Sequence, residues 1–579
     1  MTRSSAPFTV LLLFAIVLLA ACASARGPAD AGSPPAGAPP APGADGETGD
    51  IPDSKPILTY EPATTPFAKA GGATNIRANQ DSSGRNQNET TIAINPTDPN
   101  NFVGGANDAR LGSWTAAFYT TTDGGQTWVD GISPFRKNAN QGDPTVAFCG
   151  DGTAVFGYLD YVGAYQPVRL VVAKSTDGGL TWPQSGVVAE SQGTPFIDKP
   201  YIACAPNGTG TYANRVYMSW THFGTTTSPI RVAYSTDRGV TWTGAKNVSG
   251  SGGVQGSVPV AGRGGVVYVF WGGPTGIEFA KSTSGGGAWS GWQTVSSVSG
   301  IGDDLWFRRN SFPTAAIDTS RTATDGTVYV AWADSRNGDA DILLSRSIDG
   351  GTTWSAPIRV NDDPVGNGRD QFFPWMAVDE DGNVHLMWHD RREDAADDLF
   401  HVFVATSRDG GVTFDRNIKV TDVASRSSLT GFLGDYAAIA ARGGKIVPLW
   451  SDLRAGTGEE DAYLEVEPIF DYDTVQGLSF PNRTLLAFDD QEPRLGAGIT
   501  YDVVKGLVSD LAAPDAWTRA ACVAENLDAP PLTFADLPPA GDALWVLIRA
   551  QGPRGTGSYG SASEHPDARD PFDANGVCN

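Results

Sequence analysis

Basic residues are scarce in this chain. Its 579 residues include 41 Lys and Arg against 65 Asp and Glu, which gives a formal net charge of −24. A surface of that sign repels a phosphate backbone, so the composition argues against nucleic acid as a partner. The 5 histidines show no metal-ligand spacing. The sequence therefore offers no basic patch and no histidine-based metal motif.

Signatures of nucleotide binding and of serine hydrolases are missing. The chain has no P-loop, no glycine fingerprint of a dinucleotide-binding fold and no G-x-S-x-G elbow between a strand and a helix. Glycine (70 residues) and tryptophan (16 residues) are abundant instead. That combination favours a turn-rich, aromatic-packed β protein over a helical one.

The apolar run near the N-terminus is short. "FTVLLLFAIVLLAACA" follows Arg3 and is too short to span a bilayer comfortably, which is typical of a signal-peptide core. It ends in "LAAC", which resembles the lipobox of bacterial lipoproteins. The resemblance implies that residues 1–22 form the signal peptide and that Cys22 carries the lipid, with the protein in the bacterial cell envelope, at the outer membrane or cell surface. The alternative is an ordinary secretory signal that contains a cysteine.

Residues 23–72 are rich in Pro, Ala and Gly and are predicted to form a linker that buries no core. Without Cys22 the chain has four cysteines, an even number in an exported protein, which favours disulfides. Cys149 and Cys204 fall at equivalent places in neighbouring repeats, and Cys522 and Cys578 lie together in the last stretch. The sequence leaves the pairing open.

One turn motif recurs six times. The copies are TTDGGQTW (121–128), STDGGLTW (175–182), STDRGVTW (235–242), STSGGGAW (282–289), SIDGGTTW (347–354) and SRDGGVTF (407–414). The Asp can accept hydrogen bonds from turn amides, Gly supplies a positive φ, and the final aromatic ring can pack on the next strand pair. Their spacing is near that of a four-stranded propeller blade.

The motif S/T-x-D-x-G-x-x-W resembles the Asp-box (BNR) repeat of sialidases and related propellers. The resemblance covers residues 73–470 and implies that each motif joins the third and fourth strands of a blade. In that family these turns lie on the face opposite the active site. We therefore interpret them as structural staples of the fold rather than catalytic groups.

The sequence contains seven candidate innermost strands but only six turn motifs. "TNIRANQ" (74–80) resembles "APIRVND" (356–362) and "RNIKVTD" (416–422), both of which follow a motif as fourth strands. The N-terminal segment is therefore predicted to supply the outer strand of the last blade. We predict an all-β, seven-bladed propeller, with six blades as the alternative. Residues 471–579 alternate like a fibronectin III-like β-sandwich.

Carboxylates gather at the start of the innermost strands. Glu89, Asp143, Asp198 and Asp435 come from four consecutive blades around the predicted ring. Converging carboxylates need a cation, a basic partner or a raised pKa to coexist. Ca²⁺ would suit such oxygen ligands, with Asp198 as the candidate metal ligand, and no other cofactor is predicted. The alternative is that each carboxylate caps its own strand by accepting backbone amides.

Four D-x-R patterns follow the second strands. Their arginines are candidate ligands for an acidic group because guanidinium forks bind carboxylates and phosphates bidentately. The four are Arg110, Arg336, Arg392 and Arg454. The alternative, which we favour, is an ion pair of each arginine with the Asp two residues before it.

Tyr436 is a candidate nucleophile by resemblance, because sialidases use a Tyr helped by a carboxylate. Adjacent strand residues point to opposite sides, so the partner of Tyr436 is expected from another blade, with Glu89 as the example. Asp143 and Asp435 complete the candidate catalytic set. The alternative is that Tyr436 is a core or channel-lining aromatic.

The resemblance is strong for fold and weak for reaction. True sialidases carry an F/Y-R-I-P motif, and neither "IRANQ" (76–80) nor "FRRNSFP" (307–313) matches it. Two hypotheses follow: a sialidase-like glycosidase acting on acidic sugars outside the cell, or a non-catalytic propeller that binds a glycan or protein at the cell surface. The sequence favours a monomeric, sialidase-like glycan-recognition protein and leaves catalysis open.

Overall fold

The computed structural model describes residues 75–468, apart from short gaps, and the backbone of several later strands. The gaps are 164–166, 194–195, 207, 209, 225, 251, 303–307 and 416. Within the described part, helical structure is confined to two short 3-10 turns, η1 (Arg263–Gly265) and η2 (Ser427–Leu429). No helix found there is long and apolar enough to cross a membrane. The predicted signal peptide, Cys22 and the linker lie outside the described residues.

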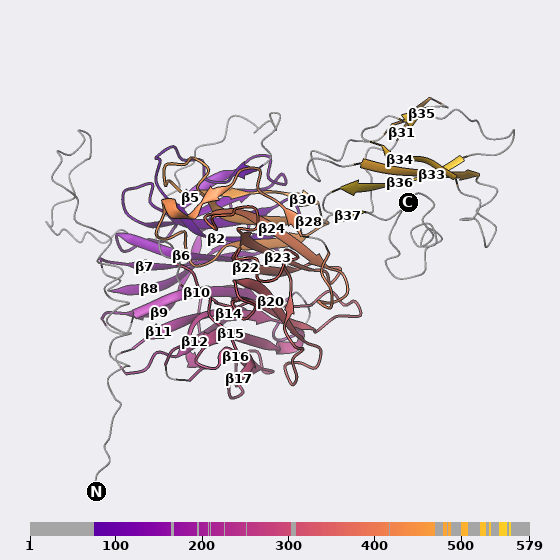
Figure 1. Ribbon diagram of the computed structural model, residues 1–579. Coiled ribbons are helices and arrows are strands. Elements are labelled where there is room, and N and C mark those ends of the chain that lie inside the picture. Colours follow the sequence, from indigo (N-terminus) through magenta and orange to yellow (C-terminus); the bar gives the residue numbers. More distant parts are fainter. Residues whose placement is uncertain are drawn as a thin grey trace, which may run out of the picture. The chain divides into compact units, whose positions relative to one another are not determined.

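Seven antiparallel sheets, the blades, make up residues 76–468 (Figure 1). Blade 1 contains β2 (Gln87–Ile94), β3 (Phe102–Asp108), β4 (Thr115–Thr121) and β5 (Val129–Ile132). Blade 2 contains β6 (Asn140–Phe148), β7 (Ala154–Tyr161), β8 (Val168–Ser175) and β9 (Gln184–Ser191). Blade 3 contains β10 (Phe196–Cys204), β11 (Val216–Phe223), β12 (Ile230–Ser235) and β13 (Lys246–Asn247). Blade 4 contains β14 (Gln255–Ala261), β15 (Val267–Gly273), β16 (Gly276–Ser282) and β17 (Gln293–Ser296).

The remaining blades follow the same order, and the last one draws on both ends of this region. Blade 5 contains β18 (Thr314–Ile317), β19 (Val328–Asp334), β20 (Asp341–Ser347) and β21 (Ile358–Arg359). Blade 6 contains β22 (Gln371–Val378), β23 (Val384–Asp390), β24 (Leu399–Ser407) and β25 (Ile418–Lys419), and β26 (Ser425–Arg426) pairs with β24. Blade 7 contains β27 (Ala438–Arg442), β28 (Lys445–Asp452), β29 (Asp461–Leu464) and β1 (Ile76–Arg77), and β30 (Glu467–Pro468) pairs with β28.

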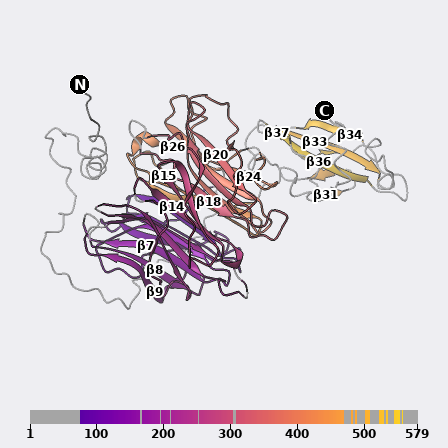
Figure 2. The ribbon, with the colours of Figure 1, turned by 90° about the horizontal axis from the view of Figure 1, so that it is seen from below.

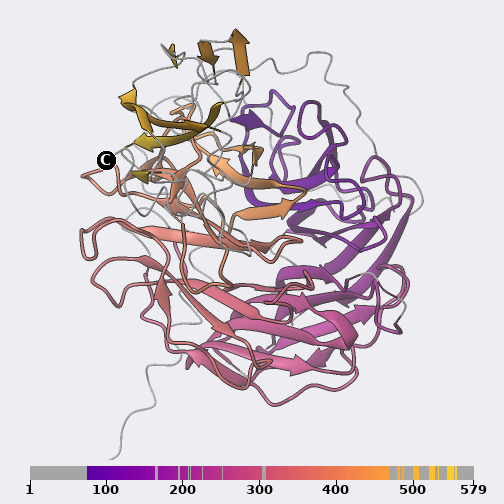
Figure 3. The ribbon, with the colours of Figure 1, turned by 90° about the vertical axis from the view of Figure 1, so that its right-hand side faces the viewer.

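The blades form a closed ring. Each innermost strand contacts the innermost strand of the next blade, and the innermost strand of blade 7 contacts that of blade 1; the strands are β2, β6, β10, β14, β18, β22 and β27. Figure 2 shows the blades from a second direction, and in Figure 3 the indigo and orange segments of blades 1 and 7 lie side by side. The fold is thus the predicted all-β propeller with seven blades, and the six-bladed alternative is wrong.

The ring closes as the sequence predicts, through the N-terminal segment. β1 pairs antiparallel with β29, with Ile76 opposite Leu464 and Arg77 opposite Tyr463. The pairing continues where the Ala78 amide donates to the Ala462 carbonyl at 2.8 Å. The outer edge of blade 7 is covered by a strand that precedes blade 1 in the chain, which joins the two ends of the ring.

Asn79 fastens this closing strand. Its buried side-chain amide lies within hydrogen-bond distance of Asp461 Oδ1 (2.8 Å), Asp81 Oδ1 (2.9 Å) and Gln87 Oε1 (3.1 Å), and its Oδ1 accepts from the Ala462 amide at 3.0 Å. One side chain therefore connects the segment after β1 with β29 and with the start of blade 1.

The six repeated turns join the third and fourth strands of blades 1 to 6. In the second copy, Ser175 Oγ donates to Asp177 Oδ1 at 2.7 Å and accepts from the Gly179 amide at 2.9 Å, while Asp177 Oδ1 accepts from the Thr181 amide at 2.9 Å. Antiparallel meanders place these turns at the end of the blade opposite the start of the innermost strand. They satisfy their own hydrogen bonds, as structural staples should.

Large aromatic side chains fill the space between neighbouring sheets. Second strands of five blades each contribute one fully buried tryptophan: Trp220, Trp271, Trp332, Trp388 and Trp450. Truncating one such ring to Ala typically lowers the free energy of unfolding by about 3–5 kcal/mol, so these rings contribute strongly to the apolar packing between the sheets.

A disulfide joins blades 2 and 3. Cys149, just after β6, is bonded to Cys204 at the end of β10, with 5.0 Å between their Cα atoms. The two cysteines stand at equivalent positions of neighbouring repeats, and the sequence had left their pairing open. Cys522 and Cys578, the other candidate pair, lie outside the residues whose side chains are described.

Beyond residue 468 the backbone forms two further antiparallel sheets. One contains β31 (Ser479–Asn482), β32 (Leu485–Ala487) and β35 (Leu532–Thr533); the other contains β33 (Thr500–Leu507), β34 (Ala521–Leu527), β36 (Leu544–Gly552) and β37 (Gly555–Thr556). These strands agree with an all-β C-terminal region. Its assignment as a fibronectin III-like sandwich stays a prediction.

The closing strand gives a testable prediction. Replacing Asn79 by Ala leaves buried partners on blades 1 and 7 unsatisfied, so we expect the free energy of unfolding to fall by about 1–3 kcal/mol in denaturant titrations. The control is Asn100→Ala, because Asn100 is exposed and its side chain accepts only from Lys445 among the described contacts; it should change stability by less than about 0.5 kcal/mol. Equal effects of the two substitutions would contradict the role given to Asn79.

Candidate functional site

Five innermost strands share a β-bulge near their start, where the register with the second strand shifts. The bulged residue has a positive φ in each: Glu89 (55°), Asp143 (52°), Lys199 (50°), Gly256 (68°) and Phe373 (51°). A bulge re-aims side chains, and such backbone is costly for residues other than glycine. In blade 3 the equivalent of Glu89 and Asp143 is therefore Lys199, and not Asp198 as the sequence predicted.

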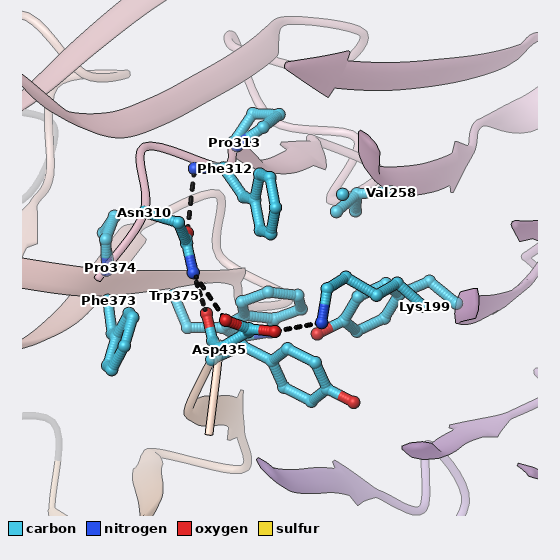
Figure 4. A pocket seen from close by; sticks show the side chains of 12 residues that line it. Lys199, Val258, Asn310, Phe312, Pro313, Phe373, Pro374, Trp375 and Asp435 are labelled. Carbon is cyan, nitrogen blue, oxygen red and sulfur yellow. Dashed lines mark hydrogen bonds and ion pairs between the residues drawn. The ribbon is translucent and has the colours of Figure 1, made fainter. Parts of the chain in front are cut away.

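Asp435 is the centre of the site. Both the Lys199 ammonium and the Arg308 guanidinium form ion pairs with its carboxylate, and Arg308 Nε donates to Asp435 Oδ1 at 2.9 Å. Asn310 Nδ2 donates to the Asp435 carbonyl at 2.9 Å (Figure 4). Burial alone would raise the pKa of Asp435, but the charges of Lys199 and Arg308 outweigh it and lower that pKa. Asp435 is therefore ionised at neutral pH.

Glu89 and Asp143 lie next to this ion cluster. Lys199 Nζ is 3.7 Å from Glu89 Oε1, and Asn107 Nδ2 donates to Glu89 Oε2 at 2.8 Å. Asn107 Oδ1 in turn accepts from the Asp143 amide at 2.7 Å. Burial and the neighbouring charge of Glu89 raise the pKa of Asp143 well above its usual range, and burial also raises that of Glu89. The protonated form of Asp143 is therefore favoured by its surroundings more strongly than that of an exposed aspartate.

Asp198 stands beside the cluster and accepts a hydrogen bond from Gln255 Nε2 at 3.0 Å. Among the described residues, no group of three or more His, Cys, Asp or Glu side chains is arranged to hold a metal ion. Lys199 and Arg308 place positive charge beside these carboxylates, and the pKa of Asp143 is raised. A Ca²⁺ ion at Asp198 stays a prediction.

Aromatic rings form the wall of a pocket above the cluster. Tyr201 stacks on half-buried Trp375 with 5.0 Å between ring centroids and meets the edge of Tyr436 at 5.1 Å. Figure 4 shows Lys199, Asp435 and Asn310 facing the space that Phe312 and Trp375 enclose. The free volume is about 10 Å³, room for one water-sized group. A larger ligand therefore inserts only one small group and rests the remainder at the mouth.

Tyr436 lines this pocket together with Asp435. The strand-alternation argument does not apply to the two residues, because both precede the first residue of β27, Ala438. Burial raises the pKa of the Tyr436 hydroxyl well above its usual range, and nearby Glu89 adds to the effect. The hydroxyls of Tyr436 and Tyr201 lie close together without the geometry of a hydrogen bond. Tyr436 is therefore a channel-lining phenol in this state.

The four D-x-R arginines are held by ion pairs away from the pocket lining. Each donates through Nε to the Asp two residues before it; the N–O distances are 2.8 Å for Arg110–Asp108, 2.8 Å for Arg336–Asp334, 2.9 Å for Arg392–Asp390 and 2.9 Å for Arg454–Asp452. Arg392 and Arg454 also bind Asp362 and Asp422, which follow the outer strands of the preceding blades. This geometry matches the ion-pair interpretation and ties neighbouring blades together.

Sequence reasoning missed three residues that line the pocket, Lys199, Asn310 and Trp375, and it missed Arg308, which pairs with Asp435 beside them. Lys199 could be found only by locating the bulge one residue after Asp198. Arg308 and Asn310 lie between β17 and β18, in a segment that does not match the repeat pattern of the blades. Trp375 stands in the innermost strand β22, and nothing in the sequence marked that its ring faces the pocket.

Comparisons with known proteins give distant structural similarity. No protein family matches the sequence, and no curated protein is similar to it. Among solved structures, a Hadza microbial sialidase is 15% identical over 55% of this chain and 66% of its own, just under two thirds, with a TM-score of 0.39. A Dyadobacter fermentans protein of unknown function is 12% identical over 69% of this chain and 100% of its own, with a TM-score of 0.38. A polysaccharide lyase, an ulvan lyase, is 12% identical over 68% of this chain and 96% of its own, with a TM-score of 0.40.

The ion cluster predicts a large effect of removing Lys199. The Lys199→Met substitution leaves buried Asp435 and Glu89 with less counter-charge, so we expect a loss of about 3–5 kcal/mol at pH 7 in denaturant titrations. Adding Asp435→Asn should recover part of that loss. Because the folded pKa of Asp435 is lowered, its ion pairs stabilise above the unfolded value of about 4 and are lost as the pH falls further.

The control for this experiment is Lys246→Met, since Lys246 is an exposed lysine whose ammonium contacts only the Gly287 carbonyl among the described contacts. It should leave stability within about 0.5 kcal/mol of the wild-type protein. A double variant no more stable than Lys199→Met alone would contradict the pairing of Lys199 with Asp435.

Proposed function

We propose that this protein is a glycan-recognition propeller whose central pocket binds one sugar residue. The observation that supports the proposal is the pairing of an acceptor, Asp435, with two donors, Lys199 and Asn310, on the floor of an aromatic-walled pocket. Asp435 already accepts from Lys199, Arg308 and Asn310, and a sugar hydroxyl, which both donates and accepts, joins this network by donating to Asp435 and accepting from Lys199. A lining of mainly apolar and aromatic residues with a few convergent polar groups is typical of small-ligand sites.

The size of the pocket fits this role. One hydroxyl group fills the free volume, while the apolar face of the sugar ring packs on Trp375 and Phe312. Backbone strain at Lys199 is stored where this recognition occurs, which is where proteins commonly keep it. The rigid ring of blades holds these groups in place before the ligand arrives.

Acidic sugars are the proposed ligand class, and Arg308 is the residue that favours them. Its side chain is 46% exposed, whereas those of Lys199 and Asp435 are 5% and 1% exposed. Arg308 also stacks on Phe432, with its guanidinium carbon 4.6 Å from the ring centroid, so its outer face is held toward solvent. An anionic group at the mouth therefore meets a positioned guanidinium.

Hydrolysis is the second candidate function, because the surroundings shift the pKa values of neighbouring carboxyl groups in opposite directions, up for Asp143 and down for Asp435. Such a split is what acid and base roles require. Asp143 does not line the pocket, however, and one of its oxygens accepts from the Lys199 amide at 3.0 Å. Binding is therefore favoured over turnover.

Export with lipid attachment at Cys22 belongs to the same proposal. The disulfide between Cys149 and Cys204 supports it, because disulfides persist in oxidising compartments such as the cell envelope. A monomer at the bacterial surface, meeting glycans or glycosylated surface proteins, fits the pocket chemistry described above.

Binding should depend on Trp375. We expect the Trp375→Ala variant to lose about tenfold or more in affinity for the best ligand of a glycan panel, measured by calorimetry, because the sugar loses its aromatic platform. The panel includes 3′-sialyllactose and lactose, so that an acidic sugar is compared with its neutral core. The matched control is Trp292→Ala, which removes a tryptophan that is 44% exposed and does not line the pocket.

The two variants distinguish glycan binding in the central pocket from nonspecific binding to exposed tryptophan. Loss of binding in Trp375→Ala alone supports the central pocket, and equal losses in both variants contradict it. Equal affinity for lactose and 3′-sialyllactose would remove the acidic-sugar part of the proposal. A panel without any binder would remove glycan recognition itself.

Turnover of fluorogenic glycosides, a sialoside among them, tests the second candidate. If the central site hydrolyses one of them, the Asp143→Asn variant should lose about 10²-fold or more in rate, since an amide cannot deliver the proton. The rate should fall as the pH rises through the raised pKa of Asp143, because the acid form is the active one. Undiminished turnover in Asp143→Asn, or turnover that rises with pH, would exclude Asp143 as the acid.

A further inference from the structure

A buried carboxyl group outside the pocket is linked to it by two separate hydrogen-bond routes. Glu460 directly precedes β29, and its side chain is fully buried. We propose that Glu460 is a positioning residue for the central pocket and that its protonation sets how the segment 430–436 is held. This inference rests on the proposed function only for its effect on ligand binding.

The first route runs through two asparagines. Asn88 Nδ2 donates to Glu460 Oε2 at 2.9 Å, and Asn88 Oδ1 accepts from Asn107 Nδ2 at 3.2 Å. The same Asn107 amide lies 2.8 Å from Glu89 Oε2. Glu89 Oε1 then accepts from the Asp435 amide at 3.2 Å. The Glu460 carboxyl is thus connected to the central ion cluster through buried side chains.

The second route runs through the segment that carries Asp435. Thr430 Oγ1 lies 2.8 Å from Glu460 Oε1 and 3.0 Å from the Phe432 carbonyl oxygen. The ring of Phe432 supports the Arg308 guanidinium, which holds the Asp435 carboxylate. A change at Thr430 is therefore transmitted to both cationic and anionic groups of the pocket.

The geometry around Thr430 accommodates both forms of Glu460. When Glu460 is ionised, the Thr430 hydroxyl donates to Oε1. When Glu460 is protonated, the proton on Oε1 is donated to Thr430 Oγ1, and the Thr430 hydroxyl is free to donate to the Phe432 carbonyl. Protonation of Glu460 thus switches the Thr430 hydroxyl from donating to Glu460 to donating to the Phe432 carbonyl.

The surroundings of Glu460 place this exchange near neutral pH. Burial raises the pKa of Glu460 to about 7, Asn88 and Thr430 oppose the rise, and the charge of Glu89 adds to it. Glu89 is the charged group that acts on Glu460 from the facing strand β2; the neighbouring Glu459 is exposed. Below neutral pH the Thr430–Phe432 anchor forms and the pocket is held for binding.

The test uses the full chain with a trifluoromethyl-phenylalanine at position 432, observed by ¹⁹F NMR without ligand. We expect the resonance to move in one step with a midpoint near pH 7. The Glu460→Gln variant should hold the low-pH position throughout, because its amide donates to Thr430 at every pH. Thr430→Val should abolish the step, and Glu459→Gln, the matched control, should keep it.

The same variants are then compared for binding of 3′-sialyllactose between pH 6 and 8. The wild-type affinity should fall about fivefold as the pH rises, and the Glu460→Gln affinity should stay at its low-pH value. A ¹⁹F step that persists in Glu460→Gln, or is missing from the wild-type protein, overturns the proposal. A ¹⁹F step that behaves as expected without any binding supports the role of Glu460 and instead removes glycan recognition.

Discussion

The closure of the ring is the constraint on which the rest of the structure depends. β1 is only two residues long, yet its pairing with β29 turns seven separate sheets into a continuous circle. Without that pairing, the outer edge of blade 7 would be open, and blades 7 and 1 would be held together mainly by the contacts of β2 with β27 and β28. Glu89 of blade 1 and Asp435 of blade 7 meet across this junction, so the central site exists only in the closed ring.

Closure also explains how so many ionisable groups are tolerated at the centre. Lys199, Arg308 and Asp435 come from positions far apart in the chain, and each is costly to bury alone. Held together, they neutralise one another, while burial and the charge of Glu89 raise the pKa of Asp143. The arrangement resembles a stored set of donors and acceptors, ready for a ligand that offers both.

The architecture was predictable from the sequence because it is repeated. Six copies of one turn motif define the blades, and the likeness of residues 74–80 to two later fourth strands identifies the closing strand. The site was predictable only in part. Glu89, Asp143 and Asp435 were found because they stand near the start of predicted innermost strands. In blade 3, however, a bulge shifts the register by one residue and puts Lys199 in place of Asp198. Arg308 was not predicted as a site residue, because its segment has no counterpart in the other blades.

The position of the closing strand has a mechanical consequence. Residue 75 leads directly into β1, so tension on the preceding chain reaches the seam of the ring before any other blade. That load is borne by the two-residue ladder, by the Asn79 contacts and by Asn75, whose side chain bonds to Val420, Glu465 and Arg454. The disulfide reinforces blades 2 and 3 on another part of the circle. Pulling from this end therefore loads the junction of blades 6, 7 and 1 first.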